Sequence, residues 1–459
     1  MFFLRIQSPS IAALQYCDQS AQTGFPMSNN TYKVLFPWAA LLATLVPSAH
    51  SADLDAAVKY INPKVVSWRR DLHQHPELSN RETRTAGIVA DHLRKLGLTV
   101  ETGIAHTGVV ALLRTGRPGP AIALRADMDA LPVVERTDVP FRSTAKANYR
   151  GEEVGVMHAC GHDSHTAVLM GVAELLVQMK NELRGDVLFV FQPAEEGAPP
   201  GEEGGASLML REGIFKRYKP EVAFGWHAWA SLTTGIIGYR SGPFMAKSQA
   251  WSAVVSGRQT HGSRPWQGID PIVIAAQIVN GLQTVVSRQV DITRNPAVLS
   301  VGIIRGGVRS NIIPDRVELS GTIRTFDEAQ YRQVTQAARR MVEQTAAANG
   351  ATAEFTLEPY RNPVLNNDPS LTTRLLPTLR KVAGAANVGE IPLITAGEDF
   401  AFFSQQVPGF YFFVGVTPRD KDVTRVASNH SPLFYLDETA LPLATRAFSQ
   451  LAIDYLSGQ

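Results

Sequence analysis

The stretch Met157-His158-Ala159-Cys160-Gly161-His162-Asp163-Ser164-His165-Thr166 places a thiol, three imidazoles and a carboxylate within ten residues. It continues into the apolar residues 167–170, which predict the start of a buried helix. Thiolate and imidazole are the ligands that zinc and its first-row neighbours prefer. Gly161 allows the backbone to turn so that Cys160 and His162 converge on one point. The stretch therefore predicts part of a metal site.

One short cluster cannot complete such a site, and three later segments carry the missing donors. They are Gln192-Pro193-Ala194-Glu195-Glu196-Gly197, Gly225-Trp226-His227 and Asn429-His430-Ser431-Pro432. On a regular strand, Glu195 and Glu196 would face opposite sides. Pro193 before them and Gly197 after them indicate that the strand has already ended, so both carboxylates can reach one site.

Length and charge limit the class of protein. A chain of 459 residues is too long for one typical core and predicts two or three domains. Lys and Arg number 44 against 42 Asp and Glu, a net charge of +2. This balance gives no reason to expect a nucleic-acid partner or an anionic membrane surface.

The N-terminal residues 1–51 resemble a leader for export. Their apolar run, 34–46, is too short to span a bilayer, and the small residues Ala49 and Ser51 fit a signal-peptidase site. We therefore expect a cleaved signal peptide and a periplasmic or secreted protein. Met27 begins a leader of ordinary length by itself and is the expected true start; the alternative is a long n-region from residue 1.

Cysteine use agrees with export. Cys17 lies in the leader, so Cys160 is the only cysteine expected in the mature chain. A single thiol cannot form an internal disulfide, and metal ligation is one explanation for its presence.

The first half of the mature chain alternates helical and strand patterns. Helices are predicted at 54–75, 82–97 and 164–180, and strands at 109–113, 121–124, 186–191 and 222–226. This alternation predicts an α/β domain with a mainly parallel sheet covered on both faces. Asp127 follows a strand end and is a candidate for holding a metal-ligating histidine in place. The alternative for Asp127 is a helix cap or a turn residue.

A different order of elements begins near residue 246. Strand, helix, two strands, helix and strand follow one another at 252–255, 271–290, 298–304, 316–323, 327–348 and 352–357. This is the split β-α-β (ferredoxin-like) order, which forms a compact unit by itself. We expect a domain of residues 246–359 inserted into a catalytic domain of residues 52–245 and 360–459, which ends in a helix at 441–456.

Five motifs, in this order, resemble the M20 metallopeptidases, and most of all their amidohydrolase branch of hippurate and auxin-conjugate hydrolases. They are His-Ala-Cys-Gly-His-Asp at 158–163, Pro-Ala-Glu-Glu-Gly at 193–197, Thr-His-Gly-Ser-Arg-Pro at 260–265, Asn-Ile-Ile-Pro-Asp at 311–315 and Gly-Glu-Asp-Phe at 397–400. The resemblance extends from about residue 65 to the C-terminus.

The resemblance implies a site for two divalent metal ions per subunit. Its ligands would be Cys160, His162, Glu196, His227 and His430. Glu195 would be the general base, taking a proton from a water molecule that the metals polarise and passing it to the leaving nitrogen. His158 and His165 would lie behind the ligands or serve in packing, and Asp163 would orient His162 or cap the next helix.

Two positions depart from the wider superfamily but match the amidohydrolase branch. Arg125 stands where many members have the histidine of His-x-Asp, and Cys160 replaces a bridging aspartate. A thiolate favours zinc, whereas the resemblance also admits manganese, cobalt and nickel, so all four metals stay candidates.

The resemblance also implies that the inserted domain is a lid and the interface of a homodimer, with a higher homo-oligomer as the alternative. His261, Asn311 and Arg324 would bind the carboxylate of the substrate and polarise its carbonyl, with His261 supplied by the partner subunit. Arg324 can equally be a strand residue facing solvent, and His261 a surface residue on a turn.

The function that these expectations favour is cleavage of N-acyl, especially aromatic-acyl, amino acids. A metallocarboxypeptidase or dipeptidase would use the same site, because the two functions differ only in what fills the acyl pocket. A periplasmic solute-binding protein is the alternative outside enzymes. It needs neither a general base nor a full set of metal ligands, so the complete constellation argues against it.

Overall fold

The computed structural model describes residues 49–358 and 362–458. The predicted leader, with Cys17 and Met27, lies outside the described residues except for 49–51, which begin helix α1 (Ala49–Gln74). Within the described residues, no helix combines the length and the apolar character needed to cross a bilayer.

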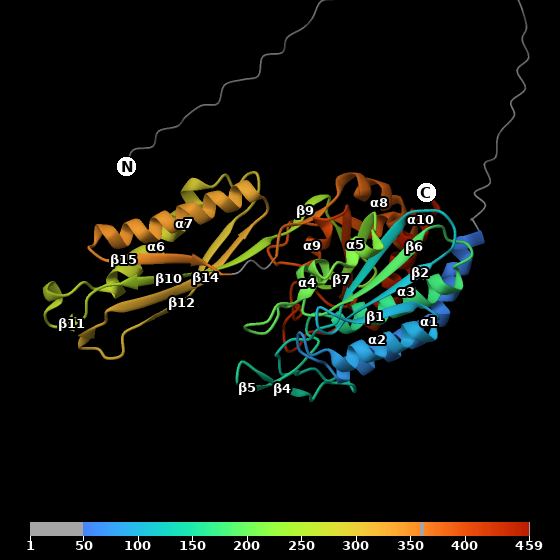
Figure 1. The fold of residues 1–459 in the computed structure, drawn as a ribbon, viewed down its shortest axis with the longest axis horizontal. Coiled ribbons are helices and arrows are strands. Elements are labelled where there is room, and N and C mark those ends of the chain that lie inside the picture. The colour runs from blue at the N-terminus through green and yellow to red at the C-terminus, as the bar shows by residue number, and fades with distance from the viewer. Residues whose placement is uncertain (1–48, 359–361, 459) are drawn as a thin grey trace, which may run out of the picture. The chain divides into compact units, whose positions relative to one another are not determined.

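An eight-stranded mixed sheet forms the larger layer (Figure 1). Its strands in spatial order are β1 (Thr99–Ile104), β2 (Gly108–Arg114), β6 (Asp186–Gln192), β3 (Ala121–Asp127), β7 (Val222–Thr233), β18 (Gly409–Thr417), β8 (Ile237–Tyr239) and β17 (Val388–Glu390). The central strands β6, β3, β7 and β18 are parallel to one another. Antiparallel pairing occurs toward the two edges, at β1–β2, β2–β6 and β18–β8.

Helices cover both faces of this sheet, as the strand pattern predicts. In β2, Val109, Ala111 and Leu113 pack into one core, and Val110 and Leu112 pack into the other, because successive side chains of a strand alternate between faces. The first core is shared with α1, α2 (Thr83–Lys95), α3 (His162–Gln178), α8 (Pro369–Ala383) and α10 (Leu441–Ser457). The second is shared with α4 (Gly205–Arg211), α5 (Ile214–Tyr218) and α9 (Phe400–Ser404).

A separate four-stranded antiparallel sheet has the order β12-β14-β10-β15. Its elements in chain order are β10 (Lys247–Ser256), α6 (Pro271–Gln289), β12 (Val298–Gly306), β14 (Arg316–Thr325), α7 (Glu328–Ala348) and β15 (Thr352–Leu357). The two helices pack on this sheet around a core of their own. The predicted split β-α-β arrangement is therefore confirmed.

The described residues form one compact unit, so the domain boundaries at 245 and 360 stay a prediction. Every element of the four-stranded sheet lies between residues 247 and 357. Three short ribbons complete the described strands. They are β4 (Lys146–Tyr149) with β5 (Glu152–Gly155), β9 (Gly242–Met245) with β16 (Leu365–Asn367), and β11 (Thr260–His261) with β13 (Ile312–Ile313).

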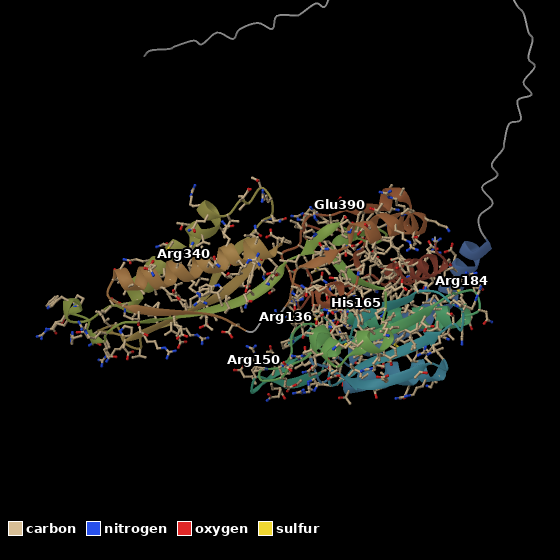
Figure 2. All side chains as sticks on the ribbon, turned by 45° about the horizontal axis from the view of Figure 1, so that its top comes forward. Arg136, Arg150, His165, Arg184, Arg340 and Glu390 are labelled. Atoms are coloured by element: carbon tan, nitrogen blue, oxygen red, sulfur yellow. The ribbon has the colours of Figure 1, made fainter. Side chains whose placement is uncertain are left out.

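Many charged side chains lie at the surface of this framework, whereas His165 lies inside it. Figure 2 shows exposed Arg150, Arg184 and Arg340 at the surface and His165 within the body of the structure. His165 belongs to α3, of which residues 162–176 are all buried. The buried helix predicted after the Cys160 stretch is therefore present, and it begins two residues earlier than predicted.

Candidate metal centre

The turn between Cys160 and His162 depends on Gly161. Its φ is +99°, in the left-handed region, and it immediately precedes the first residue of α3. A Cβ atom at this position would lie 3.0 Å from the Cβ of Ala228. Glycine therefore permits both the backbone conformation and the close approach of β7.

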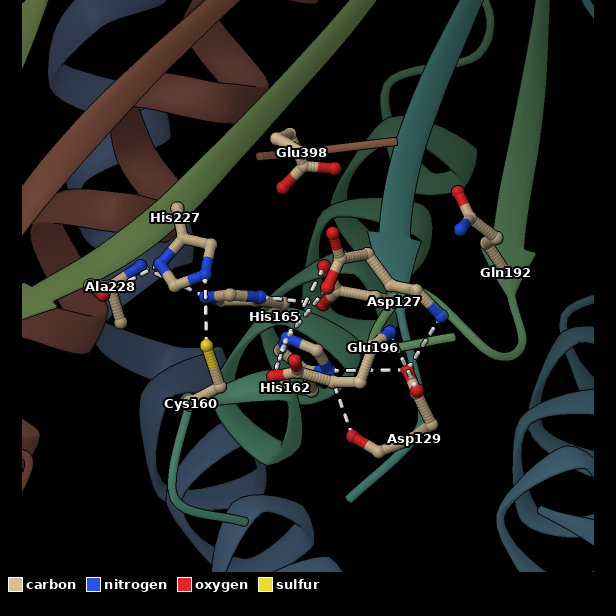
Figure 3. Close-up of polar contacts among 12 residues, drawn as sticks. Asp127, Asp129, Cys160, His162, His165, Gln192, Glu196, His227, Ala228 and Glu398 are labelled. Carbon is tan, nitrogen blue, oxygen red and sulfur yellow. Dashed lines mark hydrogen bonds and ion pairs between the residues drawn. The ribbon is translucent and has the colours of Figure 1, made fainter. Parts of the chain in front are cut away.

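The sulfur of Cys160 lies between two imidazoles. Its Sγ is 3.3 Å from His227 Nε2 (Figure 3). It is 3.2 Å from His430 Nε2. His430 Nε2 is in turn 3.1 Å from Glu196 Oε1. Ligand atoms within 4.8 Å of one another occur in the groups Cys160, His162 and His227; Cys160, Glu196 and His430; and His162, Glu195 and Glu196. The structure thus brings together all five predicted ligands and Glu195.

The imidazoles are oriented for ligation through Nε2. His162 Nδ1 donates to the carbonyl of Asp129 at 2.8 Å, and His227 Nδ1 donates to the carbonyl of Ala228 at 2.7 Å. His162 Nε2 is buried and has no hydrogen-bond partner among the described residues. Metal-binding histidines commonly donate the other ring nitrogen to a carbonyl in this way. The residues present therefore fit divalent metal ions.

The segment that carries His430 is fixed by its neighbour. Asn429 Nδ2 donates to the carbonyls of Cys160 and Ala228 at 3.1 and 3.0 Å, and Asn429 Oδ1 accepts from Ala230 N. His430 itself has a φ of +72°, a conformation that is uncommon for a residue other than glycine and that recurs at functional sites. Its side chain is 54% exposed, so it forms the open side of the cluster.

Asp129 holds the two glutamates and one histidine, a role that sequence reasoning missed. Its carboxylate accepts from the backbone N–H groups of Glu195 and Glu196 at 3.1 and 3.0 Å, and from Ser79 Oγ at 2.7 Å. Because β6 ends at Gln192, the glutamates are free to turn toward one site, as predicted. The alternating aspartates in Arg125-Ala126-Asp127-Met128-Asp129 were the available signal.

Asp127 acts mainly on His165. His165 Nδ1 donates to Asp127 Oδ1 at 2.6 Å, and His165 Nε2 accepts from Ala228 N at 2.9 Å. Both nitrogens of His165 are therefore occupied by these bonds. Asp127 Oδ2 is 3.7 Å from His162 Nε2, so Asp127 reaches the ligand set through His165 and Ala228 and not by a hydrogen bond to His162.

Burial shapes the charges in the cluster. Burial and the carboxylates of Glu196 and Glu195 raise the pKa of the Cys160 thiol well above its ordinary range. Burial, together with Glu398 and Glu196, raises the pKa of Glu195 in the same way. Burial alone would lower the pKa of His162, but the carboxylates of Asp127 and Asp129 raise it to about 10. This surplus of buried acidic groups favours cations.

A cavity of about 830 Å³ opens above the cluster. Its lining includes Cys160, Glu195, Glu196, His227 and His430, together with Trp229, Met245, Ser248, Arg324, Asn362 and Phe402. Of the predicted substrate-binding residues, Arg324 lines this cavity. His261 and Asn311 do not. His261 lies on β11 and Asn311 immediately precedes β13, where Gly262 N donates to the Asn311 carbonyl; both residues are exposed.

A buried arginine network next to Glu195 is the second feature that sequence reasoning missed. Arg125 donates to Asp127, Gln192, Glu398 and Asp399, and the backbone N–H of Asp399 lies 3.4 Å from Glu195 Oε1. The Gly-Glu-Asp-Phe motif marked two of these residues but gave no sign of their partner, which is 273 residues away in the sequence.

The sequence profile of peptidase family M20/M25/M40 matches residues 123–454. The chain belongs to this family. It is 40% identical over 399 residues to thermostable carboxypeptidase 2 of Saccharolobus solfataricus, covering 87% of this chain and 97% of that protein. It is 38% identical over 398 residues to N-acetylcysteine deacetylase of Bacillus subtilis, covering 86% and 98%. The crystal structure of a dinuclear metal-binding M20 peptidase from Bacillus subtilis has a TM-score of 0.71 and 35% identity, covering 87% and 99%.

The protein is accordingly an M20 hydrolase of the amidohydrolase and peptidase type, and it binds divalent metal. The family assignment confirms the resemblance seen in the motifs. It removes the support for a solute-binding protein, because the relatives are enzymes.

Replacing Gly161 with alanine tests the geometry of the turn. Gly161→Ala should lower metal affinity by about 10- to 100-fold, the range seen when groups that orient metal ligands are removed. Gly97→Ala is the matched control, since Gly97 has a φ of +79° and its added Cβ would have no neighbour within 4 Å. Metal affinity is measured by titration of the metal-free proteins. Equal affinity of both variants would contradict this role of Gly161.

Proposed function

We propose that this protein is an amidohydrolase with two divalent metal ions per subunit that cleaves N-acyl, particularly aromatic-acyl, amino acids. The observation that carries the proposal is the position of Glu195 at the floor of the cavity, beside the cluster of Cys160, His162, Glu196, His227 and His430. Bound divalent ions would polarise the scissile carbonyl and a water molecule.

Glu195 is the proposed general base. Its Oε2 is 3.9 Å from His162 Nε2, close to the ligands, and its carboxylate is mostly buried. Burial and nearby carboxylates raise the pKa of Glu195, which makes its carboxylate a stronger proton acceptor. Glu195 would take a proton from water and deliver it to the leaving nitrogen. Glu196, the next residue, instead pairs with His430 among the ligand atoms.

The cavity lining supports a substrate with an aromatic acyl group and a free carboxylate. Trp229, Met245 and Phe402 offer apolar and aromatic surface, and Arg324 offers a guanidinium. A guanidinium matches the planar geometry of a carboxylate, and a pocket of apolar side chains with a few polar groups is typical of small-molecule sites.

A metallocarboxypeptidase or dipeptidase is the second candidate, because one similar protein is a carboxypeptidase and Arg324 could equally hold the C-terminal carboxylate of a peptide. A panel of N-benzoyl and N-acetyl amino acids and dipeptides distinguishes the two. We expect kcat/KM for N-benzoyl amino acids to exceed that for dipeptides by about tenfold or more, the scale on which pocket fit discriminates substrates. A preference for dipeptides would support the alternative.

Metal dependence is checked on the same panel. Dialysis against a chelator should abolish hydrolysis, and zinc, manganese or cobalt should restore it, since the ligand set has no other evident role. The ion that restores the highest kcat/KM identifies the best metal among those tested. Full activity in a metal-free sample would refute the proposed function.

The two glutamates have different expected phenotypes. Glu195→Gln should retain its metal and lower kcat by about two to four orders of magnitude, the usual contribution of a positioned general base. Glu196→Gln should lose metal affinity. Metal content and kcat are measured on both purified variants. Loss of metal from Glu195→Gln alone would mean that the two roles are exchanged.

We also propose a homodimer in which the partner subunit supplies His261. The edge strand β12 supports this, because Ile303, Ile304 and Val308 on and beside it are 44%, 54% and 96% exposed. An unpaired edge with exposed apolar side chains is suited to pairing with a second copy. His261 is exposed and absent from the cavity lining within its own described chain, which is compatible with action in another subunit.

Subunit mixing tests this arrangement. His261→Ala should lower kcat by about two to three orders of magnitude without loss of metal, as removal of a donor to the developing oxyanion does. Heterodimers of His261→Ala with Glu195→Gln subunits should regain activity at one of their two sites. Absence of recovery, with subunit exchange demonstrated separately, would show that His261 does not act across the interface.

Export through a cleaved leader is proposed on the sequence pattern of residues 1–51. N-terminal sequencing of the protein expressed with its leader should find Ala52 or a residue close to it at the start of the exported chain. An intact leader on cytoplasmic protein would contradict the proposal.

A further inference from the structure

Arg125, near the end of β3, is a fully enclosed cation. Only 2% of its surface is exposed. Its Nε donates to Gln192 Oε1 at 2.9 Å, and its Nη1 donates to Asp127 Oδ2 at 2.7 Å. Its Nη2 donates to Glu398 Oε1 and Asp399 Oδ1, each at 2.9 Å. All three guanidinium nitrogens are therefore directed at fixed acceptors.

The carboxylates that Arg125 binds stand next to Glu195. Oxygen atoms of Glu195, Glu398 and Asp399 lie within 4.8 Å of one another, close enough to share a metal ion. Glu398 also accepts from Tyr411 Oη at 2.6 Å, and Asp399 accepts from Ala206 N at 2.8 Å. These bonds hold the 398–399 backbone, whose N–H at Asp399 faces Glu195 Oε1 at 3.4 Å.

The grouping of the Glu195, Glu398 and Asp399 carboxylates poses two problems for a metal enzyme, one of stability and one of unwanted metal binding. Buried carboxylates without a counter-ion are costly, and they then take up protons or any available cation. A divalent ion bound by Glu195, Glu398 and Asp399 would occupy the carboxylate that must exchange a proton with water. A guanidinium avoids both problems. It stays positively charged and so neutralises the buried carboxylates, and because it is covalently part of the chain, a metal ion from solution cannot replace it.

We infer that Arg125 is a positioning residue that acts as a permanently bound cation: it fixes Glu398 and Asp399 behind Glu195 and keeps metal ions out of this carboxylate cluster. The inference rests on the proposed role of Glu195 as the general base. The same guanidinium also binds Asp127, which accepts from His165, and His165 in turn accepts from Ala228 N on β7. Arg125 therefore supports both Glu195 and the strand that carries His227.

The test compares Arg125→Met and Arg125→Lys with Arg446→Met. Arg446 pairs with Asp55 at 2.5 Å and donates to the Val382 carbonyl at 3.1 Å, but it is not part of the metal cluster, so it controls for the loss of a structural arginine. Metal equivalents are measured by equilibrium dialysis against zinc and against manganese. Turnover on an N-benzoyl amino acid gives kcat and KM, and thermal unfolding checks the fold.

Arg125→Met should bind about one more metal equivalent per chain than the unaltered protein, and its kcat should fall by about 100-fold at a nearly constant KM, as expected for a misplaced catalytic group. Arg125→Lys keeps the charge and should bind no extra metal. Added guanidinium chloride at non-denaturing concentration should displace the extra ion from Arg125→Met and restore part of its kcat. Arg446→Met should match the unaltered protein in metal equivalents and kcat.

A folded Arg125→Met protein with unchanged metal equivalents, or without recovery by guanidinium, would overturn the inference. If Arg125→Met does not fold, the isosteric Asp399→Asn is used; it weakens the ion pair but leaves Arg125 in place, and an unchanged kcat in that variant would equally overturn the inference. The metal count does not depend on turnover. Failure of this inference is therefore distinguishable from failure of the proposed function, which Glu195→Gln tests in the unaltered background.

Discussion

The Cys160 thiol and a Glu196 carboxylate oxygen lie within 4.8 Å of each other, and so do carboxylate oxygens of Glu196 and Glu195. All three side chains are largely buried. Further carboxylates stand directly behind them, at Asp127 and Asp129. Gathering so many acidic groups in a buried space is unfavourable unless cations are present. Arg125 is that cation beside Asp127, Glu398 and Asp399. On the side that faces the cavity, the donor atoms of Cys160, Glu196 and His430 are suited to divalent metal.

Strand ends and turns bring the predicted metal-binding side chains together. Parallel strands β3, β6 and β7 deliver their polar residues to one edge, where Asp129, the glutamates and His227 converge. The left-handed turn at Gly161 adds Cys160 and His162 at the start of α3, which is buried over residues 162–176. His430 comes from the C-terminal part of the chain. Its neighbour Asn429 donates hydrogen bonds to the backbone carbonyls of Cys160 and Ala228 and so fixes this segment. Metal binding and folding are expected to be coupled here, because no single segment holds enough donors.

Much of this was predictable from the sequence, for identifiable reasons. The alternation of helices and strands, the split β-α-β order and the end of β6 before Glu195 follow from local patterns of apolar residues, glycine and proline. The predicted ligand residues come from segments with recognisable motifs, and the structure brings their donor atoms close together. Asp127 was also singled out, but its partner turned out to be His165, a tertiary contact that no local pattern specifies.

The partners of Arg125 and Asp129 illustrate the limit of sequence reasoning. Arg125 meets Glu398 across 273 residues, and Asp129 meets Glu195 across 66, so neither pairing leaves a periodic or local signal. The predicted substrate-binding residues differ in where the structure places them. Arg324 lies at the end of a long strand and lines the cavity, whereas His261 lies on a short exposed ribbon away from the cavity lining.

Anomalous diffraction from crystals grown with zinc or manganese, recorded at the absorption edge of the metal, tests the central claim most directly. The account predicts metal peaks bound by Cys160 Sγ, by Nε2 of His162, His227 and His430, and by Glu196, with Glu195 unbound beside them. Metal ligated by Glu195, Glu398 and Asp399 in the unaltered protein, or a fully active crystal without metal at Cys160, would contradict it.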